Sequence, residues 1–449
     1  MRVLRIISSI MALASLTVVG MASLSVDQNA SKRWHEWRKS QTRYPIAVWA
    51  YFGKYEGSKE EYRTYADAHL TFVSVPASQY ENAVWTGLDV LIGGWEKLHL
   101  SPDLLRERIE FSNNSKGRVI GYQLMDEPEP DSFESLAFAV QTIYELDKTK
   151  AIPIIDMLPN WAWERSSRRT KQYGCHYDGF IERFIQEVHP PVLLNCHYAP
   201  LVDGSDRPEY YANLETFRDH ALRNDIGLMA FVLCTEITGQ YRRPSDSDLR
   251  WQVYTALAYG AQGIWYWNWR IKPDEKRGFT EGLVMHDTGQ PTKNYHLVKA
   301  INAEVLAIGD VLMKLRSRHV FHTGDAIPPG ATRFPDRGDP GSSAIRRFIG
   351  DQFIIGELRN EDDPEDEDAY LIVVNKKHGM NQASTNPTLQ ATAVFKPAVQ
   401  FKYVYQYDGR AGSLELLSST KRNGEEGYYS VTLGGGQGTL LRFSRTLRR

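Results

Sequence analysis

The chain has 449 residues, which exceeds one ordinary domain and suits a barrel of about 250 residues with a smaller companion domain. Hydrophobic residues make up 42% and charged residues 24%, which is typical of a globular protein, and the formal net charge of -2 argues against a nucleic-acid-binding protein. The three cysteines, Cys175, Cys196 and Cys234, exclude a disulfide-stapled scaffold and match no metal-site spacing.

The first 22 residues have the pattern of a secretion signal. Arg2 and Arg5 precede an apolar run over residues 6–20, and Gly20 and Ala22 are the small residues that a signal peptidase requires. We expect cleavage near Ala22 and a secreted or periplasmic protein without a membrane span. An uncleaved anchor is the alternative, although the run is short for a span of about 20 residues. Residues 23–43 are polar and basic, and we expect a loose lead-in segment there.

Residues 44–318 alternate between short apolar runs and helical stretches, which is typical of βαβ units with a parallel sheet. Eight such units in this length predict a closed (β/α)8 barrel. A doubly wound open sheet is the alternative, but it usually has a glycine-rich phosphate turn after its first strand, which this chain lacks. The eight expected strands are Ile46–Phe52, Leu70–Val75, Asp89–Gly93, Val119–Met125, Ile152–Leu158, Val192–His197, Leu228–Cys234 and Gly263–Trp269.

Helical periodicity ends near His319, after a long helix expected over about Asn294–Leu315. Short alternating runs separated by Gly, Pro, Asn and Asp predict an antiparallel β-sandwich domain over residues 319–449. The acidic run Glu361–Asp368 is expected to be an exposed turn. The expected strands are Ile345–Phe348, Gln352–Leu358, Ala369–Val374, Thr392–Phe395, Lys402–Tyr405, Tyr428–Thr432 and Gly438–Phe443.

Two glutamates follow expected barrel strands at the end where barrel enzymes place their reactive groups. Glu127 follows the fourth strand and Glu236 follows the seventh. A pair of carboxyl groups on different strand ends is what glycoside hydrolysis uses: one protonates the leaving oxygen, and the other attacks the anomeric carbon or activates water. The alternatives are that Glu127 belongs to an ordinary polar turn and that Glu236 pairs with Arg242 or Arg243.

Other strand ends carry polar and aromatic side chains suited to a sugar. Strand alternation predicts that Trp265, Trp267 and Trp269 share one side of the eighth strand. The alternative is that such tryptophans only fill the layer between the barrel and its helices. The candidate substrate-binding residues are Trp49, Tyr51, Asp126, Asn160, Trp161, His197, Tyr198, Trp267 and Trp269.

No cofactor or metal ion is expected. The chain has no Gly-Lys-Ser/Thr phosphate loop, no His-Glu-x-x-His motif and no Gly-x-Ser-x-Gly elbow, which argues against nucleotide, zinc-protease and serine-hydrolase chemistry. His197 has no partner at metal-ligand spacing, so a hydrogen bond to substrate or to a catalytic carboxylate is the expected role.

With these positions in view, the chain resembles glycoside hydrolase clan A, the (β/α)8 superfamily of retaining glycosidases, over about residues 46–315. The stretch Leu249–Tyr266 is similar to the β-galactosidases of glycoside hydrolase family 42. The resemblance implies that Glu127 is the acid/base and Glu236 the nucleophile. The clan usually has Asn before the acid/base, to hold the sugar 2-hydroxyl, where this chain has Asp126. An anionic neighbour would raise the pKa of Glu127 further.

These observations predict a retaining glycoside hydrolase that acts on a polysaccharide or oligosaccharide. Two alternatives remain. The first is a catalytically inactive barrel that only binds carbohydrate, which would tolerate loss of Glu236 without losing affinity. The second is a structural surface protein in which the β-domain carries the function, which leaves the carboxylates and aromatics at the strand ends unexplained.

Overall fold

The computed structural model describes residues 28–49, 57–93, 96–115, 118–335 and 342–447. The expected signal, residues 1–22, and the candidate Tyr51 lie outside these ranges. Among the described helices, none combines the length and the apolar composition needed to cross a bilayer.

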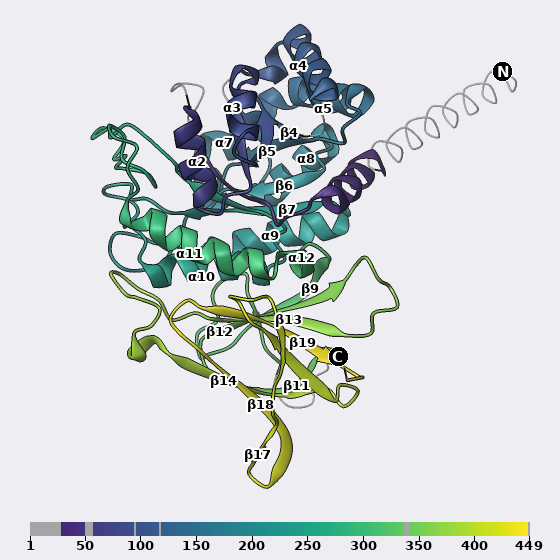
Figure 1. The fold of residues 1–449 in the computed structure, drawn as a ribbon, viewed down its shortest axis with the longest axis vertical. Coiled ribbons are helices and arrows are strands. Elements are labelled where there is room, and N and C mark those ends of the chain that lie inside the picture. Colours follow the sequence, from purple (N-terminus) through teal and green to yellow (C-terminus); the bar gives the residue numbers. More distant parts are fainter. Residues whose placement is uncertain (1–27, 50–56, 94–95, 116–117, 336–341, 448–449) are drawn as a thin grey trace, which may run out of the picture.

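Eight parallel strands form the first domain, as the sequence predicts (Figure 1). They are hydrogen-bonded in the order β1-β8-β7-β6-β5-β4-β3-β2. The backbone N–H of Thr71, beside β2, donates to the Ile46 carbonyl of β1 at 2.8 Å, which joins the two ends of the sheet into a barrel. The strands are β1 (Ile46–Val48), β2 (Phe72–Val75), β3 (Asp89–Ile92), β4 (Val119–Asp126), β5 (Ile152–Met157), β6 (Val192–Asn195), β7 (Gly227–Leu233) and β8 (Ile264–Trp267).

Helices surround the barrel, and one of them is buried on every side. Residues 247–258 of α10 are all buried, because one face packs on the barrel and another on the C-terminal domain. Such a helix lacks the polar stripe of a surface helix. The helices are α2 (Lys59–Asp67), α3 (Tyr80–Val84), α4 (Pro102–Asn114), α5 (Phe133–Leu146), α6 (Asn160–Glu164), α7 (Ser167–Tyr173), α8 (Tyr177–Val188), α9 (Tyr210–Arg223), α10 (Asp246–Ala258), α11 (Lys293–Ala307) and α12 (Gly309–Leu312).

The lead-in segment is not loose, contrary to our expectation. Residues 28–40 form a helix whose Trp34 and Trp37 are buried with the side chains of the barrel interior. The Trp37 indole N–H donates to the Ile120 carbonyl at the start of β4, at 2.7 Å. This helix therefore closes the end of the barrel at which the strands begin. The sequence pattern did not predict this helix because its two tryptophans are surrounded by basic residues.

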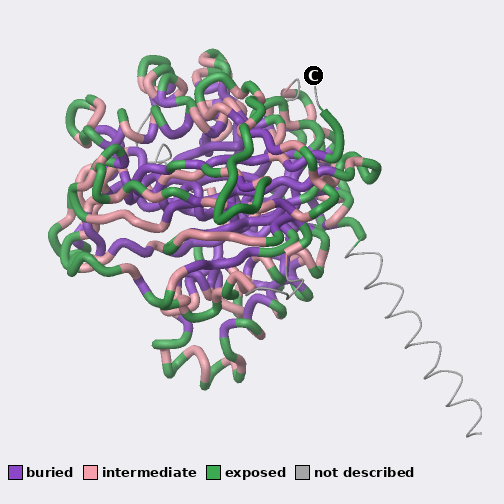
Figure 2. The backbone as a smooth tube through the Cα atoms, turned by 90° about the horizontal axis from the view of Figure 1, so that it is seen from below, coloured by how far each residue is buried: buried purple, intermediate pink, exposed green. Residues whose placement is uncertain are grey.

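The C-terminal domain is the expected β-sandwich, and Figure 2 shows the buried residues gathered in the interior of the molecule. A seven-stranded sheet in the order β10-β9-β12-β13-β19-β15-β16 faces a four-stranded sheet, β11-β14-β18-β17. The strands are β9 (Leu315–His322), β10 (Thr332–Arg333), β11 (Ile345–Ile349), β12 (Phe353–Asn360), β13 (Ala369–Asn375), β14 (Ala391–Pro397), β15 (Tyr403–Tyr407), β16 (Leu414–Leu416), β17 (Thr420–Arg422), β18 (Glu425–Leu433) and β19 (Gly438–Ser444).

The larger sheet packs directly on α10. A Cβ atom added at Gly356 of β12 would lie 2.1 Å from the Ala258 carbonyl oxygen, so only glycine permits this approach. Strand β9 starts at Leu315, four residues before the position at which the sequence pattern changes. Chain continuity and a shared helix thus join the two domains.

Candidate active site

Glu127 stands at the carboxyl end of β4 in an unusual backbone conformation. Its φ is +47°, in the left-handed region that residues with a side chain rarely adopt. Its backbone N–H donates to the Asp156 carbonyl at the end of β5, at 3.0 Å, which fixes the turn out of the strand. Strain of this kind in a non-glycine residue is frequent at functional sites.

Beside Glu127, a pair of aspartates connects β4 to β5. Asp126 and Asp156 are register partners on these strands, and their carboxyl groups are hydrogen-bonded to each other. Asp156 is only 2% exposed, whereas Asp126 is exposed. Burial and then the charge of Asp126 raise the pKa of Asp156 well above its usual value. Two carboxyl groups in contact need one shared proton, so Asp156 is the protonated donor of this pair.

The Glu127 carboxyl group has the proton affinity of a general acid. Burial and the Asp126 charge raise its pKa to about 7, against an opposing effect of Arg169. Arg169, on α7, is held by the Glu129 carboxylate at 2.8 Å and the Ala162 carbonyl at 2.9 Å. Residue Glu127 is nevertheless exposed to solvent, at the mouth of the barrel where the strands end. A pKa near the working pH is what acid/base catalysis requires.

Aromatic side chains from three strand ends gather at this mouth. The half-buried rings of Tyr198 and Trp267 have centroids 6.5 Å apart, and Trp49 lies 6.3 Å from Trp267. Burial, then neighbours that include Cys196 and Glu127, raise the pKa of the Tyr198 phenol. The Tyr198 ring therefore lies within electrostatic reach of Glu127.

Trp161, on α6, is half-buried and is covered by the Arg207 guanidinium at 4.2 Å. The same guanidinium donates to the Tyr241 hydroxyl at 3.2 Å. The Trp161 indole N–H is buried and has no hydrogen-bond partner among the described residues. It is thus available to a ligand or to water.

Glu236 follows β7, as expected, and is partly exposed. Its carboxylate lies 3.8 Å from Nε of Arg243, and its backbone carbonyl accepts from the Thr280 hydroxyl at 3.0 Å. In this structure Glu236 therefore pairs with Arg243, which is one of the alternatives that its sequence position left open.

Three further candidates have structural contacts instead of an open face. Trp269 is 1% exposed and packs behind β8 against Tyr65, with ring centroids 4.9 Å apart. Strand alternation holds for Trp265 and Trp267, which face the barrel interior, but fails at Trp269 because β8 ends at Trp267. Trp269 thus fills the layer between barrel and helices.

His197 is 1% exposed beside Tyr210, and burial followed by the Arg207 charge lowers its pKa to about 3. His197 is therefore a neutral, buried side chain that packs against Tyr210. The Asn160 side chain donates to the Glu209 carbonyl at 3.2 Å and positions α6.

Sequence reasoning missed Asp156, Arg169 and Arg207. A signal existed for Asp156 alone, because it is the one acid in the apolar strand β5. The two arginines lie on α7 and in a loop, where only the fold shows that they reach the mouth.

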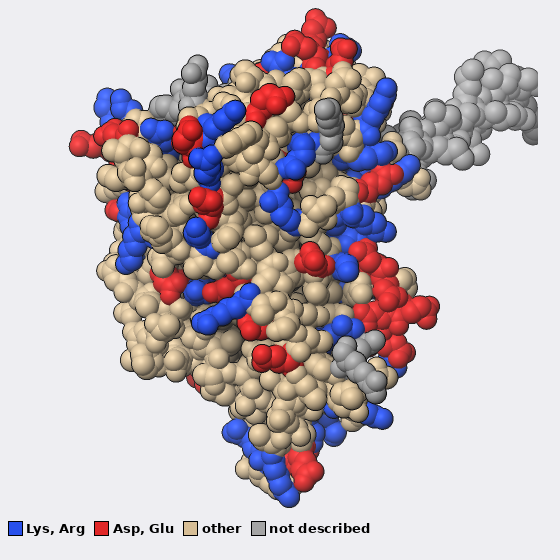
Figure 3. All heavy atoms as spheres, in the orientation of Figure 1, with Lys and Arg blue, Asp and Glu red and all other residues tan. Residues whose placement is uncertain are grey.

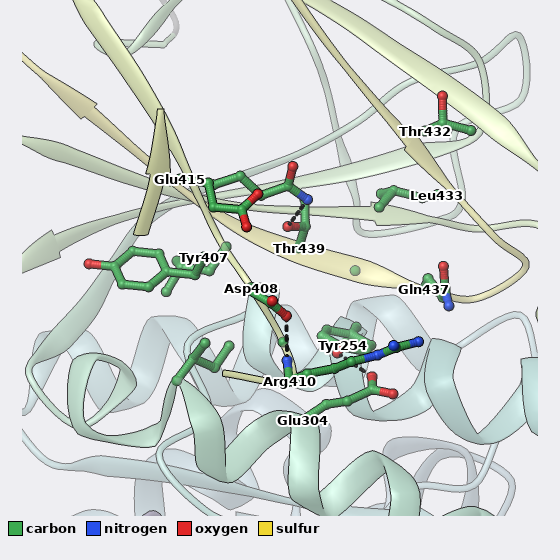
Figure 4. Close-up of a pocket in the computed structure, with 15 residues that line it drawn as sticks. Tyr254, Glu304, Tyr407, Asp408, Arg410, Glu415, Thr432, Leu433, Gln437 and Thr439 are labelled. Atoms are coloured by element: carbon green, nitrogen blue, oxygen red, sulfur yellow. Dashed lines mark hydrogen bonds between the residues drawn. The ribbon is translucent and has the colours of Figure 1, made fainter. Parts of the chain in front are cut away.

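A separate cavity of about 320 Å³ lies between α10, α11 and the β-sandwich (Figure 4). Of the three acids that line it, Glu304 is bound by Arg250 at 2.6 Å and by the Tyr254 hydroxyl at 2.9 Å, and Asp408 accepts from the Arg410 backbone N–H at 2.7 Å. The cavity is therefore a gap in the domain interface.

On the face shown in Figure 3, acidic and basic side chains are intermixed over both domains.

No family model matches the chain, and no curated protein matches its sequence. Solved structures do match. A structure described as a glycoside hydrolase has a TM-score of 0.50 at 11% identity, over 90% of this chain and 93% of its own. A β-galactosidase from Bacillus circulans sp. alkalophilus gives 0.49 at 8% identity, over 90% and 99%. A glycoside hydrolase family 30 subfamily 8 xylanase from Clostridium acetobutylicum gives 0.43 at 9% identity, over 90% and 97%.

The chain has the fold of a glycoside hydrolase. The first of these likenesses shows a shared fold, and together with the barrel and β-sandwich of this chain it confirms the fold that the resemblance to clan A implies. Assignment to family 42 stays a prediction.

Proposed function

We propose that the chain is a secreted glycoside hydrolase that cleaves a polysaccharide or oligosaccharide, with Glu127 as its acid/base. The observation that carries the proposal is the Glu127 carboxyl group, whose pKa is raised to about 7 at an aromatic-lined mouth. Half-buried Tyr198 and Trp267 supply flat surfaces against which a sugar ring stacks, and the unpartnered indole N–H of Trp161 is available to a sugar hydroxyl. The fold shared with a glycoside hydrolase supports this function.

Asp126 has a distinct part in this proposal. Its carboxylate receives the proton of Asp156 in one hydrogen bond and keeps further acceptor sites on the exposed side. Asp126 therefore only accepts a hydrogen bond from a sugar hydroxyl, whereas the Asn that is usual in clan A would both accept and donate one. Its charge also keeps Glu127 protonated near neutral pH, ready to protonate the leaving oxygen.

For the second carboxylate we propose Glu236 as the nucleophile of a retaining mechanism. This requires carboxyl groups about 5–5.5 Å apart, whereas inversion needs about 6.5–9.5 Å for an intervening water. Glu236 would have to leave Arg243, its partner at 3.8 Å, when substrate binds. Proton NMR of the first-formed sugar anomer decides between retention and inversion.

The test of the overall proposal is a screen of the purified protein against aryl-glycosides and polysaccharides. We expect Glu127→Gln to abolish turnover of natural glycans and to spare glycosylation by activated aryl-glycosides, whose leaving groups need little protonation. Glu107→Gln, an exposed carboxylate on α4, is the control. Near-normal turnover of a natural glycan by Glu127→Gln would exclude the assignment.

The pairing of Glu236 with Arg243 favours one second candidate, a barrel that binds carbohydrate without cleaving it. Isothermal titration with the glycans of the same screen separates the two functions. A binder gives a heat of binding with unchanged glycan and keeps its affinity in Glu236→Gln. Reducing ends that appear in the wild type and not in Glu236→Gln exclude this candidate.

A further inference from the structure

A short hairpin over residues 199–207 forms one side of the barrel mouth. The backbone N–H of Arg207 donates to the Ala199 carbonyl, and that of Leu201 to the Ser205 carbonyl, both at 2.9 Å. Arg207, at its end, covers Trp161 at 4.2 Å. The position of this hairpin therefore decides where the Arg207 guanidinium lies over the Trp161 ring.

A histidine of the other domain binds this hairpin. His378 follows β13 of the β-sandwich, and its side chain is 6% exposed. Its Nε2 lies 3.0 Å from the Asp206 carboxylate of the hairpin, and its Nδ1 lies 2.7 Å from the Asp248 carboxylate of α10. The ring is stacked on Trp251, with centroids 4.0 Å apart and 12° between the planes.

Arg242 completes the network. Its guanidinium lies 2.8 Å from Asp248 and 3.5 Å from Asp206, and it donates to the Leu201 and Ser205 carbonyls at 3.0 and 2.8 Å. Among the described residues, Asp206, Asp248 and Arg242 are the charged groups against His378. Two carboxylates then face one permanent cation. Asp248, Arg242 and His378 are buried and Asp206 is partly exposed, and the charges of the network are balanced only if His378 is charged.

The geometry also requires a charged ring. Each imidazole nitrogen faces a carboxylate, which only accepts hydrogen bonds, so each nitrogen must carry a proton. A neutral imidazole has a single N–H and would turn a lone pair toward one carboxylate. In agreement, burial lowers the pKa of His378, but the Asp206 and Asp248 carboxylates raise it by more, and the pKa lies above its usual value.

We propose that His378 is a positioning residue of the barrel mouth: its imidazolium ties the C-terminal domain to the hairpin 199–207, and deprotonation at alkaline pH breaks this tie and loosens the hairpin. The C-terminal domain thereby influences the position of a segment at the mouth of the other domain. Its effect on sugar binding rests on the proposed function, but the coupling itself does not.

Amide hydrogen exchange of residues 199–209, corrected for the intrinsic effect of pH on exchange, tests the coupling without a substrate. In the wild type we expect slow exchange at pH 6 and a step to faster exchange as the pH rises toward 9. His378→Asn should exchange about ten-fold faster at pH 6 and show no step. His319→Asn, an exposed histidine on β9, is the control and should keep the step. The proposal would be overturned if exchange of this segment showed no step with pH in the wild type and were unchanged by His378→Asn.

Asp206→Asn covers the case in which His378→Asn does not fold. It keeps the side-chain volume and replaces the carboxylate by an amide that a neutral imidazole can bind, so the pH step should disappear. A step that persists unchanged in this variant would contradict the proposal. If the hairpin responds as expected and no glycan is cleaved, the coupling stands and the proposed function fails.

Discussion

The backbone of Glu127 fixes the position of its side chain, and its neighbours set the pKa of its carboxyl group. The left-handed turn and the hydrogen bond to the Asp156 carbonyl determine where the side chain starts. Burial and Asp126 then determine its protonation. A general acid must be protonated to work, so activity should fall as the pH rises above about 7.

Asp126→Asn should move this loss of activity at alkaline pH to lower pH. Removal of the negative neighbour makes deprotonation of Glu127 easier, and a lower pKa means that the acid is lost earlier. The measurement is kcat/KM against pH on a substrate found in the screen. Asp131→Asn, an exposed acid in the short 3-10 helix Pro130–Ser132 that follows, is the control. A loss of activity that stays at the same pH would show that Asp126 does not set the pKa of Glu127.

The protonated state of Asp156 predicts a pH-dependent stability. Because its folded pKa is raised, its contribution to stability is present below the unfolded value of about 3.9 and declines as the pH rises toward the folded value. Asp156→Asn stays neutral and avoids this loss. The melting temperature of Asp156→Asn should therefore rise relative to that of the wild type as the pH increases from 5 to 8. A constant difference over this range would contradict a buried, protonated Asp156.

Trp267 and Trp269 should separate binding from stability. Trp267→Ala should weaken glycan binding while the protein stays folded, because the ring is half-buried at the mouth. Trp269→Ala should instead cost about 3–5 kcal/mol of stability, the usual loss for a buried aromatic side chain. Denaturant unfolding and glycan titration measure the two effects. Equal stability losses in the two variants would place Trp267 in the core as well.

At the scale of elements, the helix over residues 28–40 is a part of the barrel. A Cβ atom at Gly227, where β7 starts, would lie 2.5 Å from the Trp34 ring, so helix and strand are in direct contact. This contact closes the barrel at the end opposite the carboxylates. The helix should therefore influence stability and leave the chemistry at the mouth unchanged.

Gly227→Ala should destabilise the protein by about 1–3 kcal/mol through overpacking. Trp34→Ala should relieve that clash, so that the double variant loses less than the sum of the single losses. Gly179→Ala, on α8, meets its nearest atom only at 3.4 Å and serves as the control. Additive losses in chemical denaturation would mean that helix and strand do not touch there.

At the scale of the whole molecule, α10 is the common core of the two domains. Trp251 and Tyr254 of this helix approach Gly436 and Gly438 of the β-sandwich so closely that only glycine fits there. A truncated chain ending at residue 314 would expose this face, and burial of one such aromatic side chain is worth about 1.5–3 kcal/mol. We expect an insoluble product or a much lower melting temperature. A soluble barrel with unchanged melting would show that the domains are independent.

Much of the fold was determined by the sequence itself. The period of the apolar runs marked the eight barrel strands and most strands of the sandwich, because burial on a sheet imposes that period on any chain. Strand ends are visible in the same pattern, and Glu127 was found at one of them. The N-terminal helix was missed because its contacts are two tryptophans in a basic segment, which leave no apolar stripe.

Only the tertiary structure decided what surrounds those strand ends. Asp156 is paired with Asp126 by the register of two strands, Arg169 reaches Glu127 from α7, and His378 reaches the mouth from another domain. Trp269 changed sides because β8 ends two residues earlier. Local pattern records which face of an element is buried, whereas the proton affinity of a carboxyl group depends on charges that only folding brings near it.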